Sequence, residues 1–166
     1  MGRIARKRGR PVSFHLARVM NEEHAMPAKS ITVLLVEDDE VDVEVVRRSF
    51  TKRKIANPIH VACDGIEALE KLRGSGGKPP LPHPFVILLD LNMPRMSGIE
   101  FLDELRRDPY LRTAVVFVLT TSNKDEDRVA AYDLNVAGYI LKSNVGEGFI
   151  KMIEMLDHYW RIVELP

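Results

Sequence analysis

The sequence predicts one α/β domain in which a parallel sheet is covered by helices on both faces. Five short apolar runs alternate with five longer segments that have helical periodicity. Strands that alternate with helices favour a parallel sheet with right-handed crossovers. A chain of 166 residues with 45% hydrophobic and 29% charged residues fits one globular domain.

The apolar runs are predicted to be strands that lie buried in the sheet. The first run, residues 31–36, is apolar at nearly every position, which is typical of a strand covered on both faces. The same pattern recurs at residues 59–62, 85–89, 115–119 and 137–141.

The first two helices follow the first two strands. Helical spacing after the first strand is shown by Val41, Val45, Val46 and Phe50. Asp39 just before them is interpreted as the N-cap of this helix. Asp64 is interpreted as the cap of the second helix.

Three further helices complete the alternation. Ser97 precedes the third helix, which Asp108 and Pro109 are expected to end. The last two helices are predicted at residues 123–134 and 148–163.

Residues 1–29 are predicted to form a basic arm outside the domain of residues 30–166. The arm holds seven Lys and Arg against two Glu, a net charge of +5, so the remainder carries −5. It lacks apolar periodicity, which favours disorder. Translation that starts at Met20 or Met26 would also explain the arm, and a targeting peptide is a further alternative.

A five-residue segment of this arm, Lys7-Arg8-Gly9-Arg10-Pro11, resembles the core of an AT-hook, which binds the minor groove. One copy does not make a DNA-binding protein, and we expect no nucleic-acid partner. No apolar run approaches the roughly 18 residues of a membrane span, so we expect no membrane association. Cys63 is the only cysteine, which excludes an intramolecular disulfide and favours a cytoplasmic protein.

Polar side chains follow four of the five predicted strands. Glu37 and Asp38 follow the first strand, Asp90 the third, Thr120 the fourth and Lys142 the fifth. Ligands of an open parallel sheet bind beyond the carboxyl ends of its strands. The sequence therefore predicts a site at which two or three carboxylates, a hydroxyl and an ammonium meet.

A single Asp after a strand is commonly only a helix cap. Asp90 does not fit that interpretation, because residues 91–94 (Leu-Asn-Met-Pro) follow it and no helix begins there. Carboxylates that share a site repel unless a cation neutralises them, and a set of oxygen ligands suits Mg²⁺. The five histidines are scattered, so no Cys/His set competes for zinc.

Residues 30–160 resemble the receiver domain of two-component response regulators. Its motifs stand in order: Val36-Glu37-Asp38, Leu89-Asp90-Leu91-Asn92-Met93-Pro94 with Ser97-Gly98, Thr120-Thr121, and Ala137-Gly138-Tyr139-Ile140-Leu141-Lys142. The resemblance implies a flavodoxin-like sheet of strand order 2-1-3-4-5, an order that the general rules for doubly wound folds already give for this family.

The resemblance also implies the parts of a phosphoryl-accepting site. Asp90 would be the phosphoacceptor, and Asp38 and Asp90 would bind Mg²⁺ directly. Asn92 would offer its backbone carbonyl to the metal, and Glu37 would act through water. The chain lacks a nucleotide-binding loop, so the donor would be a phosphohistidine on a sensor histidine kinase.

Three more residues would respond to the phosphoryl group. Lys142 would pair with its oxygens, Thr120 would be the switch hydroxyl and Tyr139 the switch aromatic. The signal would appear on the face formed by the helix at 123–134, the strand at 137–141 and the helix at 148–163. Surplus apolar residues on that last helix favour a homodimer, against a helix that covers only its own core.

Two positions depart from the family pattern. Ser143 follows the lysine where proline is usual, so the common cis bond is not expected there. Glu37 stands where Asp is commoner. These features and the Tyr159-Trp160 end resemble single-domain regulators of phytochrome-type histidine kinases.

Two rival functions remain. A haloacid-dehalogenase-type phosphatase also uses an Asp after a strand, but it needs a second Asp where Asn92 stands. A receiver fold that binds partners without phosphorylation is the other alternative. We expect a phosphoacceptor whose only chemistry is self-phosphotransfer and slow autodephosphorylation, not an enzyme.

Overall fold

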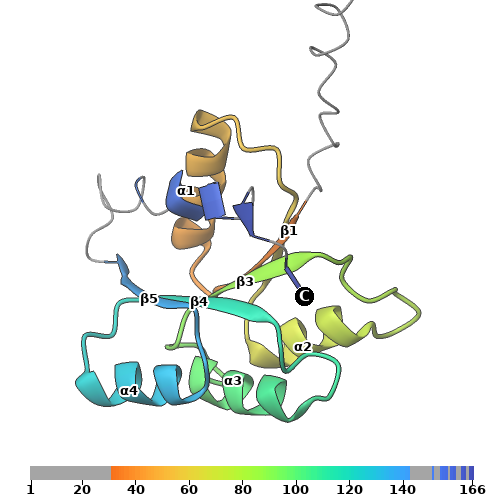
Figure 1. Ribbon diagram of the computed structural model, residues 1–166, viewed down its shortest axis with the longest axis vertical. Coiled ribbons are helices and arrows are strands. Elements are labelled where there is room, and N and C mark those ends of the chain that lie inside the picture. The colour runs from red at the N-terminus through yellow and green to blue at the C-terminus, as the bar shows by residue number, and fades with distance from the viewer. Residues whose placement is uncertain (1–30, 143–150, 152–153, 157, 160–161, 164) are drawn as a thin grey trace, which may run out of the picture.

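The protein is built on a five-stranded parallel sheet of order β2-β1-β3-β4-β5, as the sequence predicts (Figure 1). The computed structural model describes residues 31–142, 151, 154–156, 158–159, 162–163 and 165–166. The strands are β1 (Thr32–Val36), β2 (Ile59–Ala62), β3 (Phe85–Leu89), β4 (Val115–Thr120) and β5 (Gly138–Leu141).

The strand order reverses beside β1, which pairs with β2 on one side and with β3 on the other. Backbone hydrogen bonds continue one residue past the strands. The Glu37 amide donates to Ala62 (2.9 Å) and the Asp90 amide donates to Val36 (2.9 Å). This continuation fixes Glu37 and Asp90 at the carboxyl edge of the sheet, where ligands of such folds bind.

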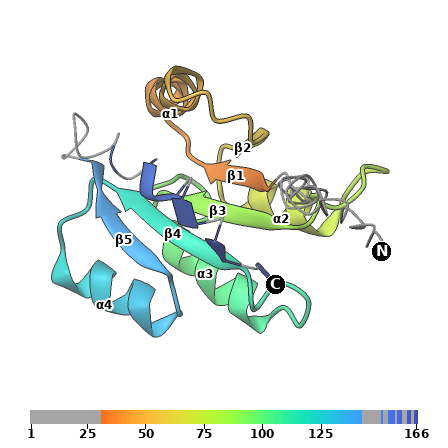
Figure 2. The same cartoon turned by 45° about the horizontal axis from the view of Figure 1, so that its top comes forward.

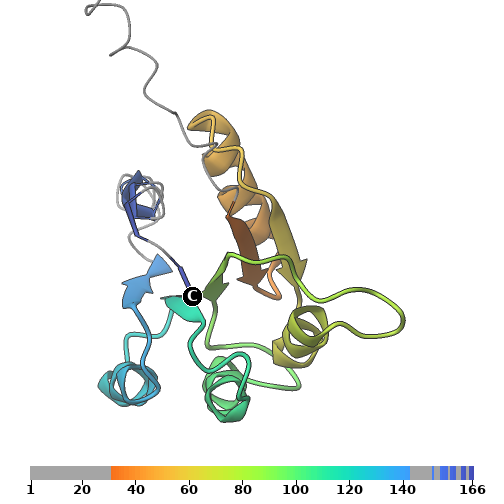
Figure 3. The ribbon, with the colours of Figure 1, turned by 45° about the vertical axis from the view of Figure 1, so that its right-hand side comes forward.

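Helices cover both faces of the sheet. The helices resolved as continuous elements are α1 (Glu40–Lys52), α2 (Gly65–Arg73), α3 (Gly98–Arg107) and α4 (Asp125–Asp133). Figures 2 and 3 show α2, α3 and α4 on one face, and α1 with the C-terminal helical residues on the other.

Successive strand residues feed two separate cores. Leu34 and Ile87 point to the α2–α4 side, whereas Leu35 and Leu88 point to the α1 side, and all four are fully buried. This alternation follows from the two-residue period of a strand. It explains why β1 and β3, which are covered on both faces, are continuous apolar runs.

Three helices begin at the caps that the sequence predicts. The Val41 amide donates to Asp39 Oδ1 (2.7 Å), and the Glu67 amide donates to Asp64 Oδ1 (2.9 Å). Ser97 and Glu100 form a reciprocal capping box at the start of α3. Each cap satisfies amides that the first turn of a helix leaves unpaired.

The predicted burial of every strand on both faces is wrong for the two edges of the sheet. In β2, only Ala62 is buried and His60 is exposed, and β5 is half-buried throughout. An edge strand has a neighbour on one side only, so its side chains are less completely covered.

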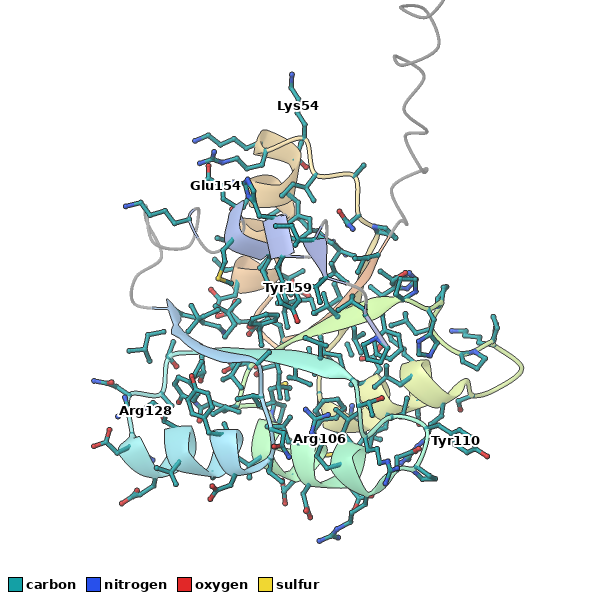
Figure 4. The ribbon with its side chains drawn as sticks, in the orientation of Figure 1. Lys54, Arg106, Tyr110, Arg128, Glu154 and Tyr159 are labelled. Carbon is teal, nitrogen blue, oxygen red and sulfur yellow. The ribbon has the colours of Figure 1, made fainter. Side chains whose placement is uncertain are left out.

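The fifth predicted helix is described only in part. Residues 151, 154–156, 158–159 and 162 are helical, and Tyr159 reaches the sheet (Figure 4), where its ring packs edge-on against Phe117 with centroids 5.6 Å apart. Arg53 at the end of α1 also forms an ion pair with Glu154. The predicted basic arm and the Lys142–Ser143 bond lie outside the described residues.

Among the residues that the structure describes, no helix has both the length and the apolar composition that a membrane crossing requires.

Candidate functional site

Three carboxylates meet at the carboxyl edge of the sheet. Glu37 and Asp38 follow β1, and Asp90 follows β3. One oxygen from each lies within 4.8 Å of the others. Glu37 and Asp90 are 3% and 5% exposed, whereas Asp38 is exposed. The set therefore has buried members and one open to solvent, and its oxygens are the donors that a hard divalent cation prefers.

Lys142 brings an ammonium into the same site from the end of β5. Its Nζ donates to Glu37 Oε2 (2.5 Å), Asp42 Oδ2 (2.7 Å) and Asp90 Oδ2 (3.1 Å). Lys142 is only 7% exposed. A buried charge of this kind is tolerated because it is paired and fully hydrogen-bonded.

The electrostatics of the site follow from burial and pairing together. Burial raises the pKa of the Glu37 carboxyl to about 7, although the hydrogen bond from Lys142 opposes that change. Burial also works against the charged form of Lys142. Hydrogen bonds to Asp42 and Glu37 outweigh it, so the pKa of the ammonium is raised. Pairing therefore favours the charged form of Lys142, whereas burial disfavours the charged form of Glu37.

Asn92 and Thr120 lie beside the acidic group. The Asn92 amide donates to Asp90 Oδ1 (3.3 Å), and its side-chain Nδ2 donates weakly to Thr120 Oγ1 (3.4 Å). Thr120 is fully buried at the end of β4. Asp90 is thus held through both carboxylate oxygens, one by Asn92 and the other by Lys142.

Tyr139 is linked to Thr120 through one intervening residue. The Tyr139 hydroxyl donates to the Ser122 carbonyl (3.0 Å), and the Ser122 amide donates to Thr120 Oγ1 (3.2 Å). The Tyr139 side chain packs against the core on the α2–α4 side, and burial raises the pKa of its phenol. The predicted switch pair is therefore connected in this structure.

Gly98 lets α3 start directly against the backbone of Asp90. A Cβ built at this position would lie 2.4 Å from the Asp90 carbonyl oxygen, so a side chain does not fit without a shift. The Gly98 amide also donates to the Leu91 carbonyl (3.0 Å). The predicted motif residues Ser97 and Gly98 thus serve to hold the segment that follows Asp90.

The structure brings the predicted carboxylates and Lys142 together, joins Thr120 to them through Asn92, and connects Tyr139 only through Ser122. It also adds two residues that sequence reasoning missed. Asp42 is not among the predicted site residues, yet it binds Lys142. Ser122 was not singled out, yet it joins Thr120 to Tyr139. The place of Asp42 in the first turn of α1 is a usable signal, because this turn begins at the same edge of the sheet.

The fold and site define a class of protein. The family model of the response regulator receiver domain matches residues 33–154. The chain belongs to this family, and is a receiver-domain response regulator of two-component systems.

Particular relatives refine this class. The chain is 36% identical over 135 residues to the response regulator Rcp1 of Synechocystis sp.. The aligned region covers 81% of this chain and 92% of Rcp1. The structure of the phosphorylated cyanobacterial phytochrome response regulator RcpA matches with a TM-score of 0.74 and 32% identity over 82% of this chain and 98% of that one. The Mn²⁺-bound form of Rcp1 matches with a TM-score of 0.72 and 35% identity over 82% and 99%.

Proposed function

We propose that this protein accepts a phosphoryl group from a sensor histidine kinase on Asp90, with Mg²⁺ bound beside it. The observation that carries the proposal is the buried contact of Lys142 Nζ with Asp90 Oδ2 (3.1 Å) inside a cluster of carboxylates. A structural ion pair needs one acid, whereas this ammonium faces three. The carboxylates around Lys142 outnumber its single positive charge, and this excess favours the binding of a second cation.

The donor set fits Mg²⁺. Asp38 and Asp90 would bind the ion directly, the Asn92 backbone carbonyl would be a third ligand, and Glu37 would act through water. Such an ion neutralises charge on the oxygens of a transferring phosphoryl group. The Mn²⁺-bound form of the similar protein Rcp1 supports the binding of a divalent ion.

The chain's own residues supply the remaining chemistry. One carboxylate oxygen of Asp90 attacks the phosphorus of the phosphohistidine, the P–N bond breaks, and its electron pair leaves on the imidazole. Lys142 is positioned to neutralise the added oxygens, and Asn92 steadies Asp90. Attack by water on the phosphorus of the acyl phosphate would later break the bond to Asp90, release inorganic phosphate and restore the free carboxylate.

The signal would leave the site through Thr120 and Tyr139. Thr120 would shift to bond the phosphoryl oxygens, and Tyr139, which already packs against the core, would respond through Ser122. The face of α4, β5 and the C-terminal helix would then change. In α4, Val129 (58%) and Tyr132 (50%) are exposed, and among the C-terminal helical residues Met155 (48%) is exposed. An exposed apolar surface of this kind supports a homodimer. A phytochrome-type kinase as the partner is supported by the likeness to RcpA.

Incubation with acetyl phosphate and Mg²⁺, followed by intact mass spectrometry, tests the proposal. The wild type should gain one phosphoryl group and Asp90→Asn should gain none. Asp39→Asn is the matched control, since Asp39 is an acid at the same edge that only caps α1. No gain in the wild type would favour a phosphorylation-independent binding module, and turnover of many phosphate esters would favour a phosphatase.

A further inference from the structure

Ser122 connects three parts of the molecule through its three polar groups. Its amide donates to Thr120 Oγ1 (3.2 Å), its hydroxyl donates to Asp127 Oδ2 (2.5 Å), and its carbonyl accepts from the Tyr139 hydroxyl (3.0 Å). Ser122 is 8% exposed. One buried serine thus contacts the hydroxyl at the site, the first turn of α4 and the aromatic side chain of β5.

Asp127 ties this serine to α4. The N-cap position of α4 is Lys124, whose side chain forms no cap hydrogen bond. The Lys124 backbone amide instead donates to Ser122 Oγ (3.4 Å). The Ser122 hydroxyl in turn donates a hydrogen bond to Asp127 in the first turn of α4. The start of α4 therefore depends on Ser122, whereas neighbouring Asp125 pairs with exposed Arg128 (2.5 Å).

We propose that the Ser122–Asp127 hydrogen bond is a latch that holds Thr120 in its unphosphorylated position and couples Asp90 to α4. This inference rests on the proposed function, in which Thr120 moves toward a phosphoryl group. Because Thr120 Oγ1 also binds the Ser122 amide, its movement pulls on the Ser122 backbone. The bond to Asp127 must then break, or α4 must follow.

Removing the latch should have two effects, one on the rate of phosphorylation and one on the response of α4. Asp127→Ala frees Thr120, so phosphorylation should be faster by about fivefold, the effect expected of one lost hydrogen bond. The same change disconnects α4 from Thr120, so phosphorylation should no longer alter amide exchange in α4. Ser122 and Asp127 are thus positioning residues that act through Thr120.

The experiment compares Asp127→Ala with two matched variants of the full chain. Asp127→Asn keeps an acceptor oxygen for Ser122 and should restore the wild-type rate. Glu126→Ala removes a carboxylate from the same turn of α4, where it is exposed, and should also behave as the wild type. The rate of phosphoryl gain from acetyl phosphate with Mg²⁺ is followed by intact mass. Hydrogen exchange is followed across residues 122–133.

A further control is the double variant Ser122→Ala with Asp127→Ala, which should be no faster than either single variant, because both remove the same bond. The latch is refuted if Asp127→Ala is phosphorylated no faster than Glu126→Ala, or if Asp127→Asn fails to restore the rate. Absence of phosphoryl gain in the wild type would instead refute the proposed function. The latch would then be judged by exchange alone, and equal exchange at the Ser122 and Lys124 amides in Asp127→Ala and Glu126→Ala would overturn it.

Discussion

At the scale of single residues, the site is organised by charge balance around Lys142. Three carboxylates surround its ammonium, and two of them, Glu37 and Asp90, are almost completely buried. Buried charges are stable only while each has its partner. The proposed Mg²⁺ would be a second partner for the same acids, so the effects of lysine and metal should be interdependent.

Lys142→Ala should therefore lower the free energy of unfolding by about 3 kcal/mol without Mg²⁺, because it leaves buried carboxylates without their cation. Saturating Mg²⁺ should recover part of this loss. Chemical denaturation measures both quantities. Lys71→Ala is the control, since the half-exposed Lys71–Glu67 pair should be worth at most about 0.5 kcal/mol. A Lys142 variant as stable as the control would show that the buried pairs contribute nothing.

The pKa of Glu37, raised to about 7 by burial, predicts a pH dependence of Mg²⁺ binding. Below pH 7 the carboxyl carries a proton that the cation must displace, so affinity should rise with pH by at most about tenfold per unit and level off above pH 7. Titration calorimetry at pH 5.5 to 8 measures this slope. Glu37→Gln cannot release a proton and should flatten it. An unchanged slope in that variant would assign the proton to another group.

At the scale of elements, α4 is held mainly by polar contacts at its two ends and only slightly by apolar packing. Its first turn is fixed through Ser122. The two carbonyls just past its C-terminus are held by Arg106 of α3, whose guanidinium donates to Leu134 (2.7 Å) and Asn135 (2.9 Å). Only Ala131 of α4 is buried. A helix with so little apolar anchoring is suited to move when one of its end contacts changes.

Arg106 lies between α3 and α4 (Figure 4) and also donates to the carbonyls of Arg112 and Ala114, at 2.9 Å each. Arg106→Ala should lower the free energy of unfolding by about 3 kcal/mol, because partly buried carbonyls lose a charged donor. Arg107→Ala, which removes an exposed guanidinium paired with Asp103, should have little effect. Denaturant midpoints compare the two, and equal losses would contradict a specific role of Arg106.

At the scale of the whole molecule, most of the fold can be predicted from the sequence, whereas parts of the site cannot. The alternation of apolar runs with amphipathic segments predicts an α/β sheet, because each pattern reports local periodicity. The strand order came only with the family resemblance, since pairing between distant strands leaves no local trace. For the same reason, the exposure of His60 on edge strand β2 was missed.

The site residues also differ in whether the sequence predicts them. Asp90 and Lys142 could be predicted because parallel strands deliver the residues that follow them to one edge. Asp42 has only the weaker signal of its place in the first turn of α1, and Asp127 has none, because its contact depends on how the first turn of α4 is oriented over that edge. Such orientations are set by packing on the sheet, which periodicity does not encode.

The proposed homodimer belongs to this scale too. If α4 contributes to the interface, Tyr132→Asp should weaken dimerisation of the phosphorylated protein at least tenfold, since it places a charge in an apolar contact. Tyr110→Asp is the matched control. Tyr110 is 89% exposed and lies in the turn after α3, away from this face (Figure 4). Sedimentation velocity over a concentration series distinguishes them, and equal association of both variants would exclude α4.

The central claim is that Asp90 takes a phosphoryl group with the help of a divalent ion. The most direct measurement is to incubate the protein with acetyl phosphate, digest it, and localise the phosphoryl by tandem mass spectrometry with and without Mg²⁺. We predict that the phosphoryl resides on the peptide that contains Asp90 and is not taken up when Mg²⁺ is chelated before acetyl phosphate is added. A phosphoryl found on another residue, or one whose uptake is unchanged by chelation, would contradict the account.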